Sequence, residues 1–600
     1  MSATDYASLD AEDVAWDLDS LLPTPDESGV DTLLADAAHI ADVLEQQRGK
    51  VGDFDGATLA SFMEGLAELQ EHVGRAASYA GLRFSADTTE PRNGALMQRV
   101  EEMATALSTR LLFFELEWAE VPDEDVEELL AHPRLAFCRH HLRSMRRYRP
   151  HLLTEPEEKI LAEKAVTGSG AWVRLFEELT SVIEVDIDGD KESLESTLSR
   201  LHSNDRDVRR HAAERATAAL EPGLRTRAYL FNTLLADKSI DDRLRNFGSW
   251  IASRNLANEA SDESVDALVT AVRGRFSIPQ RWYTLKAQLL GLDRLADYDR
   301  MAAVSDDQST FDFGPAVELV LDSYESFSPE LADVAAKFVD EHWIDAPVRP
   351  GKRGGAFCAY TVPSHHPYVL LNWTARRRDV LTLAHELGHG LHAYLARPQG
   401  VFHQTTPLTL AETASVFGET VTFGRLLSTT DDPAVRFALL AESLEDQIAT
   451  VFRQIAMNRF EAAVHTTRRD EGELSVERFG EIWAESQADM LGDSVEITEG
   501  YRSWWSYIPH FIGSPGYVYA YAYGQLLALS VYARYEELGS DFVPRYLDLL
   551  RAGGSATPEE LGRIVGVDLA DPGFWDAGLD IVEQRLFDTE EAAKAAGRIH

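Results

Sequence analysis

The chain has 600 residues and a formal net charge of −43 at pH 7, with 100 Asp and Glu against 57 Lys and Arg. Such a negative surface repels phosphates and anionic lipid headgroups, which excludes nucleic acids and membrane surfaces as expected partners. The hydrophobic fraction of 44% excludes a disordered chain, and a chain of this length is expected to form two or more lobes.

The beginning of the chain and its cysteines indicate a cytoplasmic protein. Residues 1–19 are acidic and lack the basic and apolar regions of a secretory signal. No apolar run approaches the roughly 18 residues of a membrane-spanning helix. Cys138 and Cys358 are the only cysteines, too few for a disulfide framework and outside any Cys-x-x-Cys pair. We expect two partly buried thiols in a reducing compartment.

The distribution of charge indicates adaptation to high salt. Acidic residues are spread along the whole chain, and only nine of the basic residues are lysine. At molar salt the Debye length falls to about 3 Å, so the self-repulsion of such a surface is screened. The alternative is an ordinary acidic protein of a low-salt cell, and a fold and activity that survive dialysis into low salt would favour it.

Helical periodicity dominates the sequence. Apolar residues recur at helical spacing over 31–47, 57–73, 96–120, 156–164 and 206–220. Between these runs, β-branched residues followed by Asp-Gly predict a β-hairpin within 180–193. A new set of long helices follows that turn, so we expect a domain boundary near residue 200. These patterns predict a mainly α fold.

The segment 354–396 carries the strongest chemical signal. Two β-prone runs flank a Pro-Ser-His-His-Pro turn in 354–373, and a helix is predicted over 376–396, with HELGH at its centre. Residues i and i+4 lie on one helix face, so His385 and His389 can present ring nitrogens to one metal ion. Glu386 is turned by about 100° and reaches a water on the metal rather than the metal. The alternative is two ordinary polar residues on a helix face.

A third ligand is needed, because catalytic zinc usually takes three protein ligands and leaves one position for water. The extended metzincin pattern is excluded, since positions 392 and 395 are His and Leu instead of Gly and His. A helix predicted over 406–423 offers Glu412 and Glu419 nearly on one face. We expect Glu412 to be the third ligand and Glu419 to orient a ligating histidine. A solvated surface acid is the alternative for Glu419.

HELGH followed by AETAS (411–415) resembles the thimet-oligopeptidase-type metallopeptidases of family M3, and within them the oligoendopeptidase F group. The resemblance spans nearly the whole chain, through WDLDSLLP, GGAFCAY with YVLLNW, SNDRDVRRHAAERA and WSYIPHFIGSPGYVYAYAYGQLLAL. It implies a two-lobed, mostly helical ellipsoid with a deep central channel, zinc at the channel floor and a small β-sheet near the zinc helix. It divides the chain into an oligoendopeptidase F N-terminal lobe (1–200) and an M3 catalytic domain (201–600).

The resemblance also implies a mechanism. One zinc ion per chain is held by His385, His389 and Glu412, and Glu386 takes a proton from water and passes it to the leaving amine. In related enzymes a histidine and one or two tyrosines from the 508–524 region contact the substrate carbonyl or the oxyanion. His510 matches this histidine. Tyr517 is the first expectation for the tyrosine and Tyr521 the second, since i and i+4 share a helix face, whereas Tyr519 and Tyr523 are expected to pack.

The expected substrates are short, unstructured oligopeptides. In the family, the strand before the zinc helix pairs with the peptide backbone, and Gly354 and Gly355 would allow that approach; a plain turn is the alternative. A monomer is the default state, and zinc against cobalt or manganese is left open by the ligand types. Two other functions stay open: a zinc carboxypeptidase, which needs a basic residue for the terminal carboxylate, and a non-catalytic peptide-binding protein, which would have no use for Glu386.

Overall fold

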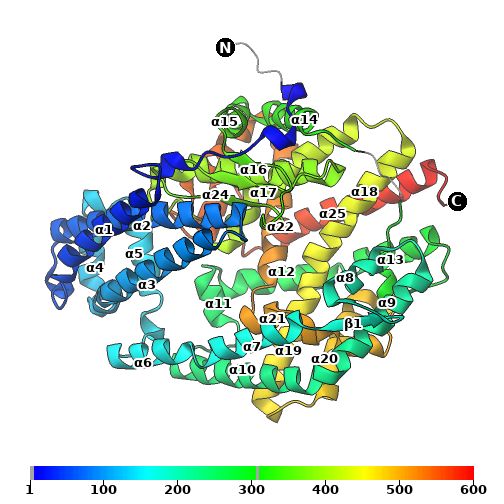
Figure 1. Ribbon diagram of the computed structural model, residues 1–600, viewed down its shortest axis with the longest axis horizontal. Helices are drawn as coiled ribbons and strands as arrows, with labels where there is room; N and C mark the ends of the chain where they lie inside the picture. The colour runs from blue at the N-terminus through cyan, green and yellow to red at the C-terminus, as the bar shows by residue number, and fades with distance from the viewer. Residues whose placement is uncertain (1–5, 306–309, 600) are drawn as a thin grey trace. The chain divides into compact units, whose positions relative to one another are not determined.

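The computed structural model describes residues 6–305 and 310–599, and most of them are helical (Figure 1). Contacts group the chain into two compact units of three segments each. Unit 1 is Met1–Leu152, Gln308–Thr429 and Val531–Asp568, and unit 2 is Leu153–Asp307, Thr430–Ser530 and Leu569–His600. The predicted mainly α fold is confirmed. The predicted division into 1–200 and 201–600 concerns family segments rather than spatial grouping, and it stays a prediction.

Unit 1 opens with a layer of long helices, and α1, α2 and α3 pack side by side (Figure 1). Aspartates begin the first two: Asp26 accepts a hydrogen bond from the Ser28 N–H, and Asp55 from the Thr58 N–H, which satisfies free donors of the first turn. The helices of this unit are α1 (Glu27–Glu45), α2 (Gly56–Ala86), α3 (Pro91–Glu120), α4 (Asp123–Leu130), α5 (Arg139–Arg146), α14 (Phe313–Phe327), α15 (Pro329–Asp340), α16 (Arg377–Ala396), α17 (Leu408–Ser428), α23 (Val543–Ala552) and α24 (Pro558–Ile564).

Unit 2 is also helical and is built around a large aromatic core. Phe231 stacks on Phe479 and Trp505, and Phe460 packs on Trp483 and Phe511 in the same core. The helices of this unit are α6 (Glu155–Ala165), α7 (Ser169–Ser181), α8 (Leu194–Ser199), α9 (Arg206–Leu220), α10 (Leu224–Leu244), α11 (Ala252–Ala257), α12 (Asp262–Gly274), α13 (Ser277–Leu289), α18 (Pro433–Gln447), α19 (Gln454–Glu471), α20 (Val476–Leu491), α21 (His510–Gly513) and α25 (Pro572–Ala595). Helix α22 (Tyr519–Leu538) has residues in both units.

The sheets are small. Strand β6 (Tyr368–Leu370) lies between β4 (Ile344–Asp345), to which it is parallel, and β5 (Phe357–Ala359), to which it is antiparallel. This sheet contacts α16, so the small sheet expected near the zinc helix is confirmed. The hairpin predicted within 180–193 is also confirmed, as β1 (Glu184–Ile187) and β2 (Asp190–Ser193). Strand β3 (Leu295–Ala296) pairs in parallel with β7 (Val495–Glu496).

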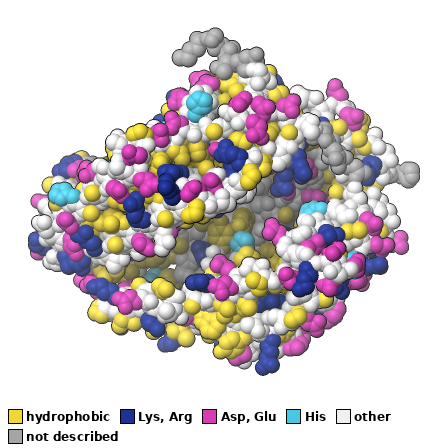
Figure 2. Space-filling view, viewed as in Figure 1, with side chains coloured by type: hydrophobic (Ala, Val, Ile, Leu, Met, Phe, Trp, Pro, Cys, Tyr) yellow, Lys and Arg dark blue, Asp and Glu magenta, His cyan; other side chains and the backbone are white. Residues whose placement is uncertain are grey.

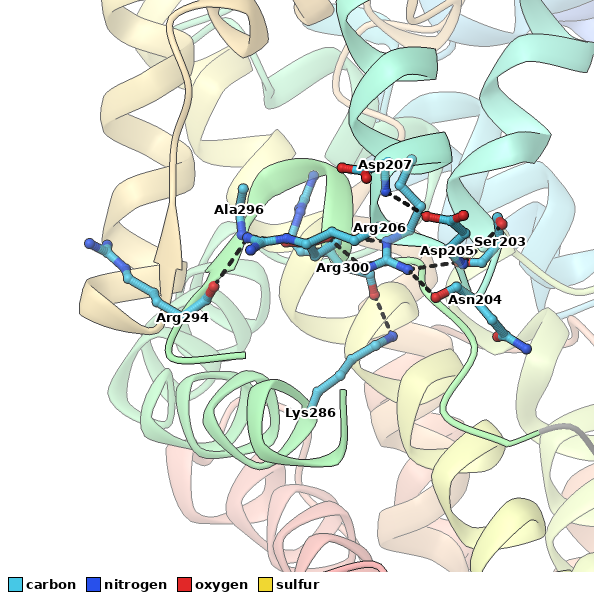
Figure 3. A network of polar contacts seen from close by, with 11 residues as sticks. Ser203, Asn204, Asp205, Arg206, Asp207, Lys286, Arg294, Ala296 and Arg300 are labelled. Carbon is cyan, nitrogen blue, oxygen red and sulfur yellow. Dashed lines mark hydrogen bonds and ion pairs between the residues drawn. The ribbon is translucent and has the colours of Figure 1, made fainter. Parts of the chain in front are cut away.

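A buried ionic network in unit 2 surrounds Asp299, whose side chain is fully buried. Figure 3 shows residues of this network, among them Ser203, Arg206 and Ala296. Arg209 donates to Asp299 Oδ1 from Nη2 (2.8 Å) and Nε (3.1 Å), and Arg206 lies 2.9 Å from Oδ2. The Ala296 N–H donates to Oδ2 as well (2.9 Å), and the remaining Arg209 nitrogen donates to the Ser203 carbonyl (2.8 Å). The network therefore ties α9 to the turn that follows β3.

Exposed side chains form many ion pairs, such as Arg174 with Glu178 and Lys159 with Glu155. Figure 2 shows Asp and Glu side chains dispersed over the visible face rather than gathered in one patch. Among the helices of the described residues, none combines the length and the apolar character needed to cross a membrane.

Candidate metal centre

Helix α16 carries the HELGH motif and is held in place by N-terminal hydrogen bonds and by its buried apolar residues. Its N-terminus is fixed by Asp379, which accepts hydrogen bonds from the backbone N–H groups of Thr374 (2.7 Å) and Arg376 (3.1 Å). Its apolar residues are buried, including Val380, Leu383, Leu387 and Leu391. The helix predicted over 376–396 is confirmed. Its packing fixes which way the two histidines point.

Helix α17 lies against α16 at unusually close range, and Gly388 inside HELGH is the reason. A Cβ at this position would lie 2.5 Å from the Ala414 carbonyl oxygen and 2.6 Å from the Ser415 Cα. Only glycine allows the two backbones to approach so closely. Tyr324 of α14 supports the same turn by donating to the Ala384 carbonyl (2.8 Å). The close approach brings Glu412 to the histidine face of α16.

His385, His389 and Glu412 converge on one point, with candidate ligand atoms all within 4.8 Å of one another. Glu412 Oε2 lies 3.3 Å from His385 Nε2 and 3.5 Å from His389 Nε2. A tetrahedral zinc site with bonds of 2.0–2.1 Å has ligand–ligand edges of about 3.3–3.4 Å, so these separations fit a metal. Over residues 6–305 and 310–599, this is the one group of three or more His, Cys, Asp or Glu side chains with that geometry.

The contacts behind the cluster include the one predicted for Glu419. Its Oε2 lies 3.3 Å from His385 Nδ1, the ring atom that faces away from Glu412. A carboxylate in this position fixes the tautomer and the ring orientation of a histidine ligand. Ser415 similarly donates to Glu412 Oε2 (2.6 Å) and holds that side chain against its own helix.

The electrostatics of the cluster favour a positive charge among the three side chains. Burial opposes a charge on His385, but hydrogen bonds with Glu412 and Glu419 and the charges of Glu412 and Glu386 outweigh burial and raise the pKa of His385 to about 10. Burial also opposes the ionised form of Glu412, yet His385 and His389 lower its pKa to about 2. Burial lowers the pKa of His389 to about 4, which favours the neutral ring.

A cavity of about 380 Å³ opens beside the cluster and is lined by Glu386 and His389. Glu386 is only 7% exposed, and its carboxyl group faces the backbone N–H of Cys358. Burial, with the nearby charge of Glu412, raises the pKa of Glu386 to about 7, although the charge of His385 opposes this shift. A carboxylate whose pKa lies near the working pH is suited to proton transfer. One residue of the cluster, His389, and the candidate base Glu386 therefore line the same small cavity.

Two further residues line this cavity and were not predicted as site residues. Cys358 and Tyr360 come from β5 and the residue after it. Burial raises the pKa of both side chains well above their usual values, so each is a neutral group there. The Tyr360 ring lies 6.5 Å from the His389 ring. The signal that could have found them is the alternation of a strand, which puts residues two apart on one face.

His510, Tyr517 and Tyr521 form a second cluster, in unit 2. His510 Nε2 lies 3.2 Å from the Tyr521 hydroxyl, and the Tyr517 ring lies 6.0 Å from the His510 ring and 5.1 Å from the Tyr521 ring. As expected, Tyr519 and Tyr523 are buried packing residues: Tyr519 donates to Asn255 (2.8 Å), and Tyr523 packs edge-on against a tryptophan. The three residues expected to act on the substrate thus lie together, and the two expected to pack do so.

Comparison with known proteins identifies the family. The family model of Peptidase family M3 matches residues 199–581, and that of Oligopeptidase F matches residues 117–184. The chain is 26% identical over 600 residues to oligopeptidase PepF of Bacillus subtilis, covering 98% of this chain and 88% of the relative. It is 26% identical over 597 residues to group B oligopeptidase PepB of Streptococcus agalactiae, covering 98% of both chains.

Solved structures show the same fold. Oligoendopeptidase-F from Enterococcus faecium superposes with a TM-score of 0.72 at 23% identity, covering 95% of this chain and 99% of that one. A peptidase structure from Chlamydophila abortus superposes with a TM-score of 0.86 at 23% identity, covering 98% and 99%. The M3 match spans more than half of the chain and includes the HELGH helix. The chain therefore belongs to peptidase family M3 and is a metalloendopeptidase of the oligoendopeptidase F group.

Proposed function

We propose that this peptidase is a zinc-dependent endopeptidase that hydrolyses short, unstructured oligopeptides. The observation that supports it most is the separation of 3.3 Å and 3.5 Å between one Glu412 oxygen and the two histidine nitrogens, beside a cavity that also holds Glu386. The names of the two curated relatives, both oligopeptidases, support peptides as the substrate class. The deep channel expected from the resemblance would exclude folded proteins by size.

The proposed chemistry gives each side chain one role. His385, His389 and Glu412 would hold the zinc, which supplies a Lewis acid and lowers the pKa of water in its open position to about 7. Glu386 accepts a proton from the attacking water and later passes it to the amine nitrogen that leaves. Glu419 holds the His385 ring in the orientation that ligation needs.

We also propose, from the family resemblance, that His510 and the nearby tyrosines donate hydrogen bonds to the substrate carbonyl as it gains negative charge. Tyr517 remains the first choice and Tyr521 the second. Strand β5 is the edge strand of its sheet, and residues 356–358 line the cavity, which supports pairing with a substrate backbone. A Cβ at Gly354 or Gly355 would have no described atom within 4 Å, so there is open space beside these two glycines, which precede β5.

A quenched fluorogenic peptide tests this function. The purified protein is incubated with it in the presence and absence of a chelator, zinc is added back, and mass spectrometry identifies the products. We expect internal cleavage that the chelator abolishes and zinc restores. A peptide blocked at both ends separates the alternatives: its hydrolysis excludes a carboxypeptidase, whereas binding without hydrolysis in the presence of stoichiometric zinc would favour a peptide-binding protein.

The acidic surface supports a further proposal, that this is a cytoplasmic enzyme of a high-salt cell. The dispersed acidic side chains of Figure 2 repel one another at low ionic strength, and the few lysines of the chain offset little of this repulsion. We expect the thermal midpoint and activity to fall on dialysis from molar to millimolar salt, with a monomer by size-exclusion chromatography at high salt. Full activity and an unchanged midpoint at low salt would contradict adaptation to salt.

A further inference from the structure

Unit 2 contains a buried carboxyl group that the proposed chemistry does not use. Glu461 lies on α19 with 0% of its surface exposed. Its Oε1 accepts one hydrogen bond, from the backbone N–H of Gly516 (2.9 Å). Its Oε2 is buried and has no hydrogen-bond partner among the described residues. A carboxyl group is costly to bury with so little compensation, so its presence at this point needs a reason.

The partner of Glu461 lies in the loop over 514–518, which joins α21 to α22 and carries Tyr517. Gly516 has φ of +73°, and a Cβ there would lie 2.5 Å from the Ile251 Cδ1 atom. Arg254 of α11 donates from Nε to the Pro515 carbonyl (3.2 Å), so the C=O and the N–H of the single Pro515–Gly516 peptide group are held by two different helices, α11 and α19. The loop is therefore fixed by its surroundings rather than by its own turn alone.

The protonation of Glu461 is compatible with a role as a fixed acceptor. Burial raises the pKa of Glu461 to about 8, although the Gly516 N–H and the Arg254 charge lower it in part. The side chain is thus mostly neutral at pH 7, and an amide of the same shape would present the same acceptor oxygen. This similarity supplies a conservative variant.

We propose that Glu461 is a positioning residue: together with Arg254 it clamps the 514–518 loop and sets the position of Tyr517. This inference rests on the proposed role of Tyr517 at the substrate carbonyl. Tyr517 follows the clamped peptide directly, and its ring packs against His510 and Tyr521. A shift of the Gly516 peptide therefore moves the first tyrosine of the cluster. Misplacement of such a group by about 1 Å costs on the order of 100-fold in rate.

The test compares Glu461→Leu with Glu461→Gln, each alone and combined with Tyr517→Phe. Steady-state kinetics with the fluorogenic peptide give kcat and KM at high salt. We expect Glu461→Leu to lower kcat about 10–100-fold with little change in KM, and Glu461→Gln to retain most of kcat, because it keeps the acceptor. In the Tyr517→Phe background, Glu461→Leu is expected to add little further loss, since its effect passes through the tyrosine.

Hydrogen exchange supplies a readout that is independent of activity. The peptide covering 514–518 is expected to exchange faster in Glu461→Leu than in Glu461→Gln, with exchange elsewhere in unit 2 unchanged. Should Glu461→Leu not fold, Gly516→Ala replaces it, because its Cβ would push the loop off Ile251. Zinc content and the circular dichroism of every variant are measured alongside.

The outcomes separate this inference from the proposed function. A folded Glu461→Leu with wild-type kcat, or losses that multiply fully in the double variant, overturns the positioning role. Wild-type kcat in Tyr517→Phe alone removes the proposed role of the tyrosine, and the clamp is then judged by exchange. Faster exchange of 514–518 in the leucine variant but not in the glutamine variant upholds the clamp, and equal exchange overturns it.

Discussion

Two polar clusters of this molecule, a fully buried one around Asp299 and a partly buried one at the metal centre, are arranged in opposite ways. Around Asp299, two arginines and a backbone N–H meet both carboxylate oxygens, and Arg209 directs its remaining nitrogen to a carbonyl (Figure 3). In the metal centre, two imidazoles crowd one oxygen of Glu412, while Glu386 has no ion-pair partner among the described residues and only a backbone N–H faces it.

The two clusters differ in whether protein groups alone satisfy their polar atoms. Where every polar atom is satisfied by the protein itself, as at Asp299, the cluster holds elements together and leaves nothing to bind a ligand. At the metal centre two imidazoles converge on one carboxylate oxygen, and the nearby carboxyl group of Glu386 has a raised pKa. Such an arrangement is typical of a functional site rather than of a structural ion pair. The first cluster is therefore structural, and the second is the part of the molecule in which chemistry is expected.

The largest effect expected is on catalysis and leaves the fold intact. Glu386→Gln removes the proposed proton acceptor but none of the three proposed metal ligands, so we expect kcat to fall by about 10³–10⁴-fold with one metal ion per chain retained. Peptide hydrolysis and elemental analysis measure the two quantities. Glu178→Gln, an exposed carboxylate on α7, is the matched control and should keep full activity. A Glu386→Gln enzyme within tenfold of the wild type would show that this carboxylate is not the base.

The Asp299 cluster should respond in stability instead. Asp299→Asn leaves Arg209, which is 1% exposed, as a buried charge without its counter-ion, and breaking such a pair costs about 3–5 kcal/mol. We expect the urea midpoint of unit 2 to fall, and hydrogen exchange in α9 is the method that monitors it. Metal content and the kcat of the folded fraction should be unchanged. The control is Asp207→Asn, whose side chain is 82% exposed. An equally small loss in both variants would remove the distinction between the two clusters.

A smaller effect is expected behind the metal ligands. Glu419→Ala leaves all three ligands in place but removes the carboxylate 3.3 Å from His385 Nδ1. Losing such a supporting group typically weakens metal affinity about 10–100-fold. Competition with a metal chelator measures the change, and activity should return at saturating zinc. Wild-type metal affinity in Glu419→Ala would mean that Glu419 does not support His385 and is a solvated surface acid, which is the alternative given in the sequence analysis.

The metal cluster was predictable because its signals are local. His385 and His389 are one helical turn apart, and Glu412 and Glu419 are two turns apart on the next helix, so periodicity alone put each pair on one face. The structure adds why the two helices meet, which is the absence of a side chain at Gly388. Nothing in the periodicity of either helix specifies that contact.

Other parts of the site depend on pairing between distant residues, and sequence reasoning missed them. Tyr360 directly follows β5, and the alternation of that strand puts Cys358 and Tyr360 on one face without specifying that this face lines the cavity beside Glu386. Glu461 has the sequence context of any helical acid, and its burial depends on Gly516, 55 residues away. Charged residues in helices are usually on the surface, so the sequence pattern predicts an exposed Glu461, whereas this side chain is buried.

The smallest effect is expected where charges face water. Arg174 and Glu178 form an i,i+4 pair at 3.0 Å on α7, with the arginine side chain 81% exposed. Solvent screens such a pair, so Arg174→Ala should change the free energy of unfolding by less than about 0.5 kcal/mol at low salt and by nothing measurable at molar salt, where the Debye length is about 3 Å. Urea titrations at both salt concentrations measure this. A loss of unfolding free energy comparable with that of Asp299→Asn would mean that burial does not govern the strength of these ion pairs. The contrast between the Asp299 cluster and the metal centre would then lose its physical basis.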